Sequence, residues 1–151
     1  MRLKANEAGL ERLFSALGIG VDDLLGEGGE AWVFALDEER IARVSRGATR
    51  DQVDGRTRLL AELGQSAHKV PFSIPAILDT HEIEGRVVTI ERRLPGRPLD
   101  QLLTEKSGAA REALIRSYLE TANRLGDLAL PRPWFGDLGQ TGGIRTRTSE
   151  R

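Results

Sequence analysis

An apolar stripe at helical spacing marks the beginning of the chain. Four hydrophobic side chains recur at positions i, i+3, i+4 and i+7: Leu10, Leu13, Phe14 and Leu17. This period places them on one face of a helix, and Gly18 directly after them is a common stop signal. We therefore predict an amphipathic helix over 6–17, within an N-terminal segment 1–19.

Short runs rich in β-branched and aromatic residues follow this helix. Three of them come close together, at 24–25, 31–36 and 40–44. The acidic residues 37–39 connect the last two runs as a hairpin turn would. Two further runs within 76–91 flank Glu84–Gly85, which suits a second turn. The pattern therefore predicts short strands that form two hairpins.

One helix is predicted between the two hairpins. Thr49 or Asp51 can provide its N-cap, and Gly64 its end. Three leucines are expected on its buried side: Leu59, Leu60 and Leu63. The following segment, 68–75, contains two prolines and is predicted to be a loop.

Helical periodicity returns after a connector rich in proline and glycine, residues 92–98. A short helix is expected close to 99–103, and a long one over 109–125. The long helix carries an apolar stripe: Leu114, Tyr118, Ala122 and Leu125.

This order of elements indicates an α+β protein in two lobes. The strand-rich lobe covers 20–91, and residues 92–98 connect the two lobes. Residues 99–130 form the start of the helical lobe. The remaining tail, 131–151, is predicted to be irregular.

Composition narrows the class of protein. A length of 151 residues suits one ordinary domain. The sequence contains no cysteine, which excludes disulfides and thiolate metal sites and agrees with a cytoplasmic protein. The net charge of −1 gives no global attraction to nucleic acid, and no apolar run is long enough to predict a membrane span.

Two further features of the composition have ordinary explanations. Of the 22 cationic residues 19 are arginine, which suits phosphate or carboxylate recognition but also follows from coding bias alone. The two histidines, His68 and His81, have no other metal-ligand residue types near them in a suitable pattern. No metal site is therefore expected.

A glycine-rich segment and two charged residues form the candidate site. Three glycines lie between strand-like runs: Gly26, Gly28 and Gly29. Glycines there allow backbone N–H groups to approach a phosphate, although an ordinary hairpin turn has the same composition. Arg43 lies inside a strand-like run, where a cation requires a carboxylate, and Glu62 among leucines of the next helix is the expected partner.

In this order, these residues resemble the N-terminal lobe of the protein-kinase-like fold, in particular the aminoglycoside phosphotransferases and related small-molecule kinases. The stretch "GEGGEAWV" resembles their glycine-rich loop, and "RVSR" from Arg43 resembles their strand motif. The stretch "LPGRPL" resembles their hinge region, and Glu62 stands where their helix glutamate does. The resemblance covers about 20–130 and implies a five-stranded antiparallel sheet with one helix, followed by a partial helical lobe.

The resemblance also implies a nucleotide site. ATP or GTP would lie beneath the loop, with its phosphates on the glycine backbone and Arg43 and its base against Val33 and Ile41. Backbone groups of the hinge would bind the base: Glu91, Arg92 and Arg93. The implied activity is phosphorylation of a hydroxyl on a small molecule, with Mg²⁺ as the accompanying metal.

The catalytic part of the family pattern is not matched. The family has a loop of the form H-G-D-x-x-x-x-N, whereas this chain has "FGDLGQTG" from Phe135, with Asp137 as its one aspartate. We therefore predict no catalytic residue, with the metal ligands outside this chain and the chain inactive alone. A truncated gene, a frameshift or a fragment would each explain this.

Two other readings stay open. The lobe could be a non-catalytic, pseudokinase-like interaction module that associates through the apolar stripe at 114–125. The plainer reading is a small α+β domain in which Arg43 and Glu62 form a surface ion pair. Nucleic-acid binding ranks third, after the phosphotransferase and the interaction module, because the 22 basic residues are matched by 23 acidic ones.

Overall fold

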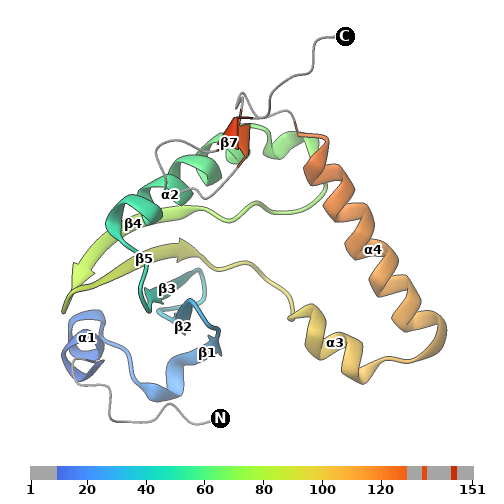
Figure 1. Ribbon diagram of the computed structural model, residues 1–151. Coiled ribbons are helices and arrows are strands. Elements are labelled where there is room, and N and C mark those ends of the chain that lie inside the picture. Colours follow the sequence, from blue (N-terminus) through green and yellow to red (C-terminus); the bar gives the residue numbers. More distant parts are fainter. Residues whose placement is uncertain (1–9, 129–133, 136–143, 146–151) are drawn as a thin grey trace.

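A computed structural model describes residues 10–128, 134–135 and 144–145 (Figure 1). In chain order its elements are α1 (Leu10–Leu17), the 3-10 turn η1 (Val21–Asp23), β1 (Leu24–Glu27), β2 (Ala31–Ala35), β3 (Arg40–Ser45), α2 (Arg50–Gln65), the 3-10 turn η2 (Ala67–Lys69), β4 (Ile77–Ile83), β5 (Arg86–Arg92), α3 (Leu99–Glu105), α4 (Gly108–Gly126), β6 (Trp134–Phe135) and β7 (Ile144–Arg145).

Strands β1 to β5 form one antiparallel sheet in the order β1-β2-β3-β5-β4. The last hairpin thus inserts β5 beside β3 and leaves β4 at the edge. With helices α1 to α4, the chain is an α+β protein, as the pattern of elements predicts. The five-stranded antiparallel sheet with one interposed helix, expected from the resemblance, is confirmed.

The face of the sheet toward α1 holds the main hydrophobic core. Side chains that alternate along three strands supply it: Trp32, Phe34, Ala42, Val44, Val88 and Ile90. The predicted helical stripe meets them, with Leu10 and Leu13 buried. The rings of Phe14 and Phe34 pack edge to face, with centroids 5.3 Å apart.

Local signals define the other elements of this lobe as predicted. Thr49 caps α2, since its side chain accepts the N–H of Gln52 while Gln52 accepts the N–H of Thr49. The helix ends at Gln65, one residue after the predicted end. Glu84 and Gly85 connect β4 to β5 with φ of 51° and 70°, the conformation of a tight two-residue hairpin.

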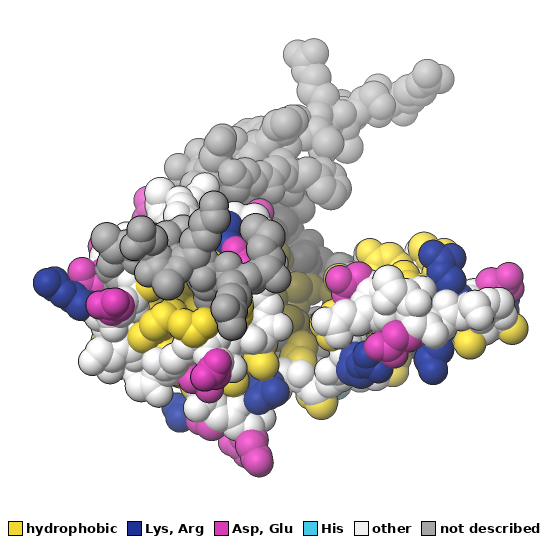
Figure 2. Space-filling model, turned by 90° about the horizontal axis from the view of Figure 1, so that it is seen from below, with side chains coloured by type: hydrophobic (Ala, Val, Ile, Leu, Met, Phe, Trp, Pro, Cys, Tyr) yellow, Lys and Arg dark blue, Asp and Glu magenta, His cyan; other side chains and the backbone are white. Residues whose placement is uncertain are grey.

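Helices α3 and α4 follow the connector and lie apart from the sheet (Figure 1). No residue of α4 is buried, and Tyr118, Leu119 and Leu125 are 57%, 55% and 42% exposed. Figure 2 shows hydrophobic side chains along α3 and α4, at the right of the view. In the predicted tail 131–151, β6 pairs with β7, and the remainder lies outside the described residues.

Candidate functional site

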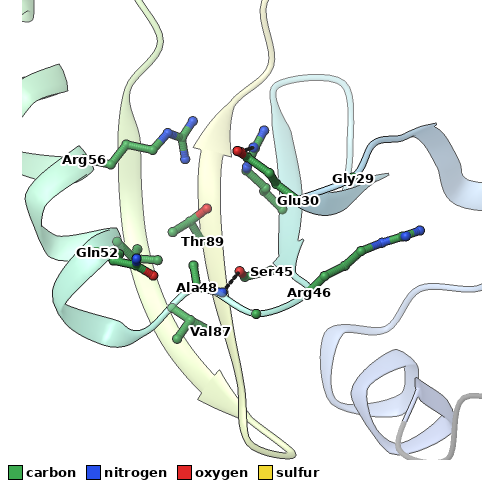
Figure 3. Close-up of a pocket in the computed structure, with 12 residues that line it drawn as sticks. Gly29, Glu30, Ser45, Arg46, Ala48, Gln52, Arg56, Val87 and Thr89 are labelled. Carbon is green, nitrogen blue, oxygen red and sulfur yellow. Dashed lines mark hydrogen bonds and ion pairs between the residues drawn. The ribbon is translucent and has the colours of Figure 1, made fainter. Parts of the chain in front are cut away.

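A cleft of about 790 Å³ opens on the face of the sheet opposite α1 (Figure 3). The glycine-rich turn, β3, β5 and the first turns of α2 form its walls. Its polar lining comes mainly from Glu30, Arg43, Ser45, Gln52, Arg56 and Thr89. We call it the Arg43 cleft.

Strand register explains why Arg43 points into this cleft. Arg43 lies opposite Val33 on β2 and opposite Thr89 on β5, and cross-strand partners share a face of the sheet. Its neighbours Ala42 and Val44 point the other way, into the core. The alternation therefore places the Arg43 side chain, which is 33% exposed, on the floor of the cleft.

The predicted ion pair between Arg43 and Glu62 is wrong. Arg43 Nη2 lies 3.8 Å from Glu30 Oε2, on the glycine-rich turn. Glu62 does not line the Arg43 cleft, because nine residues, about two and a half turns of α2, separate it from the buried Val53. The cap at Thr49 and the buried position of Val53 together set this helical phase.

The α2 side chain that forms an ion pair with the sheet is that of Arg56. Its two terminal nitrogens donate to both carboxylate oxygens of Glu91, at 2.7 and 3.1 Å. Glu91 is 4% exposed and also accepts a hydrogen bond of 2.6 Å from Thr89 Oγ1. The helix thus carries the cation and the sheet the carboxylate, and Glu91, expected at the hinge through its backbone, buries its side chain under α2.

The glycine-rich turn leaves open space beside it. Gly26 lies opposite Val33, and the Gly28 N–H donates to the carbonyl of Ala31 at 2.9 Å. None of Gly26, Gly28 and Gly29 has a positive φ, and a Cβ at Gly26 or Gly29 would meet nothing within 4 Å. The fold therefore does not require glycine there, which leaves close approach by another molecule as a reason for it.

The predicted site residues are only partly brought together. Gly29 and Arg43 line the Arg43 cleft, whereas Gly26 and Gly28 line an adjoining hollow with Gly29. Val33 and Ile41 are half-buried on the same sheet face as Arg43, outside the cleft wall.

The hinge arginines lie at a third place. Arg92 and Arg93 line a separate hollow with Arg40. Their backbone N–H groups donate to Ala76 and Glu39, at 2.9 and 2.7 Å. The chain itself thus already occupies the donors of the predicted hinge contact with a base.

The described residues contain no group of three or more histidine, aspartate or glutamate side chains that could hold a metal ion. His81 Nε2 lies 3.1 Å from Asp79, and His68 is exposed. Asp137 lies outside the described residues. None of the described helices combines the length and the apolar character that crossing a membrane requires.

Comparison by sequence finds no matching family model and no matching curated protein. Comparison by structure finds two aminoglycoside phosphotransferases. One is APH(2")-IIia, solved with GDP and kanamycin: TM-score 0.53, 18% identity, 70% of this chain and 36% of that chain covered. The other is APH(2")-IIa, solved with streptomycin and ATP: TM-score 0.51, 16% identity, 85% of this chain and 42% of that chain covered.

These likenesses show that the chain has a phosphotransferase-like fold, in agreement with the resemblance read from its motifs. The matched region is the strand-rich lobe with a partial helical region. The chain spans about two fifths of the length of these two proteins.

Proposed function

We propose that this chain is the nucleotide-binding part of a small-molecule phosphotransferase, and that the Arg43 cleft holds the phosphates of ATP or GTP. One observation carries the proposal. A guanidinium on β3 and a glycine-rich turn border the same cleft, in the fold of proteins solved with GDP and with ATP.

The residues of the cleft suit a polyphosphate. Arg43 can bind phosphate oxygens through two donors at once, and its present partner Glu30 is 93% exposed and only weakly held. Exposed glycine backbone allows close approach from the other side. Val33 and Ile41 supply apolar surface on the same face of the sheet for the base.

The acceptor would be a hydroxyl of a small molecule, the class to which the aminoglycosides in the two solved complexes belong. Bound Mg²⁺ would neutralise phosphate charge, but the described residues offer no cluster to hold it. We therefore assign the described residues nucleotide binding alone, and expect no phosphoryl transfer by this chain by itself.

Thermal unfolding tests the proposal. A ligand at about 100 times its Kd stabilises a protein by about 2.7 kcal/mol, which raises the Tm by several degrees at this size. Millimolar ATP or GTP with Mg²⁺ should raise the Tm of the wild-type chain, and R43A should abolish the rise. R50A is the matched control, since Arg50 pairs with Asp54 on α2 and does not line the cleft. A wild-type chain without any rise, or an equal rise in R43A, contradicts the proposal.

A second candidate function is a non-catalytic interaction module. The observation in its favour is α4, whose apolar stripe has no buried member. An exposed stripe of this kind is typical of a surface that binds another protein or a second copy of the same chain. The concentration dependence of sedimentation tests it.

A further inference from the structure

We propose that Arg46 is a positioning residue that holds the glycine-rich turn over the Arg43 cleft. The fluorescence of Trp32 should show whether the contact with Arg46 is intact. The inference rests on the proposed function for its consequence, which is nucleotide affinity. Its basis is a set of contacts around the Arg46 guanidinium. Arg46 is the last residue of the "RVSR" stretch, but that motif gives it no role.

Arg46 attaches both ends of the turn formed by residues 27–30. Its backbone N–H donates to the carbonyl of Glu30 at 2.8 Å. Its guanidinium forms an ion pair and hydrogen bond with the carboxylate of Glu27. Arg46, directly after β3, thus holds the first and the last residue of the turn.

The same guanidinium stacks on a buried indole. Its central carbon lies 4.2 Å from the ring centroid of Trp32, which is 2% exposed. Cation–π stacking strengthens when the pair is desolvated, and the flat guanidinium stacks better than an ammonium group. Trp32 Nε1 has no hydrogen-bond partner among the described residues. A second guanidinium, that of Arg86, lies 5.3 Å from the same ring centroid, so Arg46 makes the nearer of the two cation–π contacts.

The position of Arg46 links this contact to the cleft. Arg46 follows β3 three residues after Arg43, and it lines both the Arg43 cleft and the adjoining hollow under the glycines. In Figure 3 its side chain extends away from Arg56 and Gln52, toward the far side of the turn. Arg43 therefore faces the proposed phosphates while Arg46 holds the turn from behind.

The turn has few other means of staying in place. Gly26, Gly28 and Gly29 are all exposed, and glycine backbone loses the most conformational freedom when it is ordered. Beyond the β1–β2 pairing, which extends to Glu27 and Trp32, the turn has the backbone hydrogen bond of Gly28 with Ala31. Without Arg46, the turn should leave the cleft and carry Glu30 away from Arg43.

The experiment uses tryptophan fluorescence in a W134F chain, where Trp32 is the one remaining tryptophan. R46M is introduced there, with R46K as the matched variant that keeps the charge and loses the flat stack. We expect R46M to raise the Kd for ATP about tenfold and to raise acrylamide quenching of Trp32 before any nucleotide is added. The Kd and the quenching of the R46K chain should lie between those of the W134F chain and the R46M chain. R43A should lose ATP binding while the quenching of Trp32 stays unchanged.

An unchanged Kd in a folded R46M chain overturns the inference. If R46M fails to fold, E27Q takes its place, because it removes only the exposed ion pair; an unchanged Kd in E27Q then overturns the inference. If neither the wild-type chain nor the W134F chain binds nucleotide, the proposed function fails. Hydrogen exchange at residues 27–31 then tests the positioning role. If these amides are protected equally in the W134F chain and in its R46M or E27Q variant, the positioning role is overturned.

Discussion

Arg56 on α2 and Glu91 on β5 are 35 positions apart in the sequence and form a bidentate ion pair. The side chain of Glu91 is 6% exposed and that of Arg56 is 31% exposed. Val53 and Gly55 are the fully buried residues of this helix, whereas the predicted leucines, Leu59, Leu60 and Leu63, are only half-buried. The position of α2, and with it one wall of the Arg43 cleft, depends strongly on this pair.

Removing Arg56 should therefore destabilise the fold substantially. R56M leaves the carboxylate of Glu91 buried without its cation, and the expected loss is about 3 kcal/mol of the free energy of unfolding. Urea denaturation measures it. R50A removes an exposed ion pair on the same helix and should cost less than about 0.5 kcal/mol.

The double variant R56M/E91M separates a specific pair from general damage. With both charges gone, no buried charge stays unpaired, so the double variant should lose less than the two single variants combined. Additive losses would mean that the two side chains act independently of each other.

Replacing Gly85 by alanine should destabilise the fold, whereas replacing Gly64 by alanine should stabilise it. Gly85 has a φ of 70°, which an alanine adopts only with strain, so G85A should cost about 1 kcal/mol. Gly64 lies in α2 without a positive φ, and a Cβ there meets nothing within 4 Å. G64A should gain about 0.5 to 1 kcal/mol, because alanine favours helix. Thermal unfolding of both variants checks the opposite signs; equal losses would contradict the role of the turn conformation.

Asp37 should make stability depend on pH in acid. The hydrogen bond from the Arg40 side chain, followed by that from the backbone N–H of Glu39, lowers the pKa of the Asp37 carboxyl below its ordinary value. A pKa that is lower in the folded state contributes stability above the unfolded value of about 4, and this is lost as the pH falls through the folded value.

The Tm of the wild-type chain should therefore fall more steeply than that of D37N between about pH 5 and pH 2. E38Q is the control, since Glu38 is an exposed neighbour of the same charge. Parallel pH profiles for wild type and D37N would show that this turn does not couple ionisation to folding.

The apolar stripe of α4 should promote self-association if the interaction module is the function. The wild-type chain should then sediment faster as its concentration rises, and Y118E/L125E should remove this dependence. R116E changes the net charge of α4 by the same amount at an exposed polar position, so it should retain the association. A wild-type chain that sediments as a monomer throughout contradicts this function.

The elements themselves follow from local sequence. The leucine and phenylalanine stripe of α1, the cap at Thr49 and the Glu84–Gly85 turn each specify structure through neighbours only a few residues away. Such signals can be read without knowing the rest of the fold, because hydrophobic period, capping and backbone conformation act over one or two turns. Alternation along β3 likewise placed Arg43 opposite the core.

The partners of the charged residues were decided by the tertiary structure. Arg43 lies beside Glu30 instead of Glu62, and Arg56 binds a carboxylate that is distant in the sequence. The Arg56–Glu91 pair depends on the rotation of α2 about its axis and on the insertion of β5 beside β3. The Arg43–Glu30 pair depends on the register of β2 with β3, which brings the glycine-rich turn beside Arg43. Long-range packing sets both, so residue type and order along the chain could locate the candidate cations but could not assign their counter-ions.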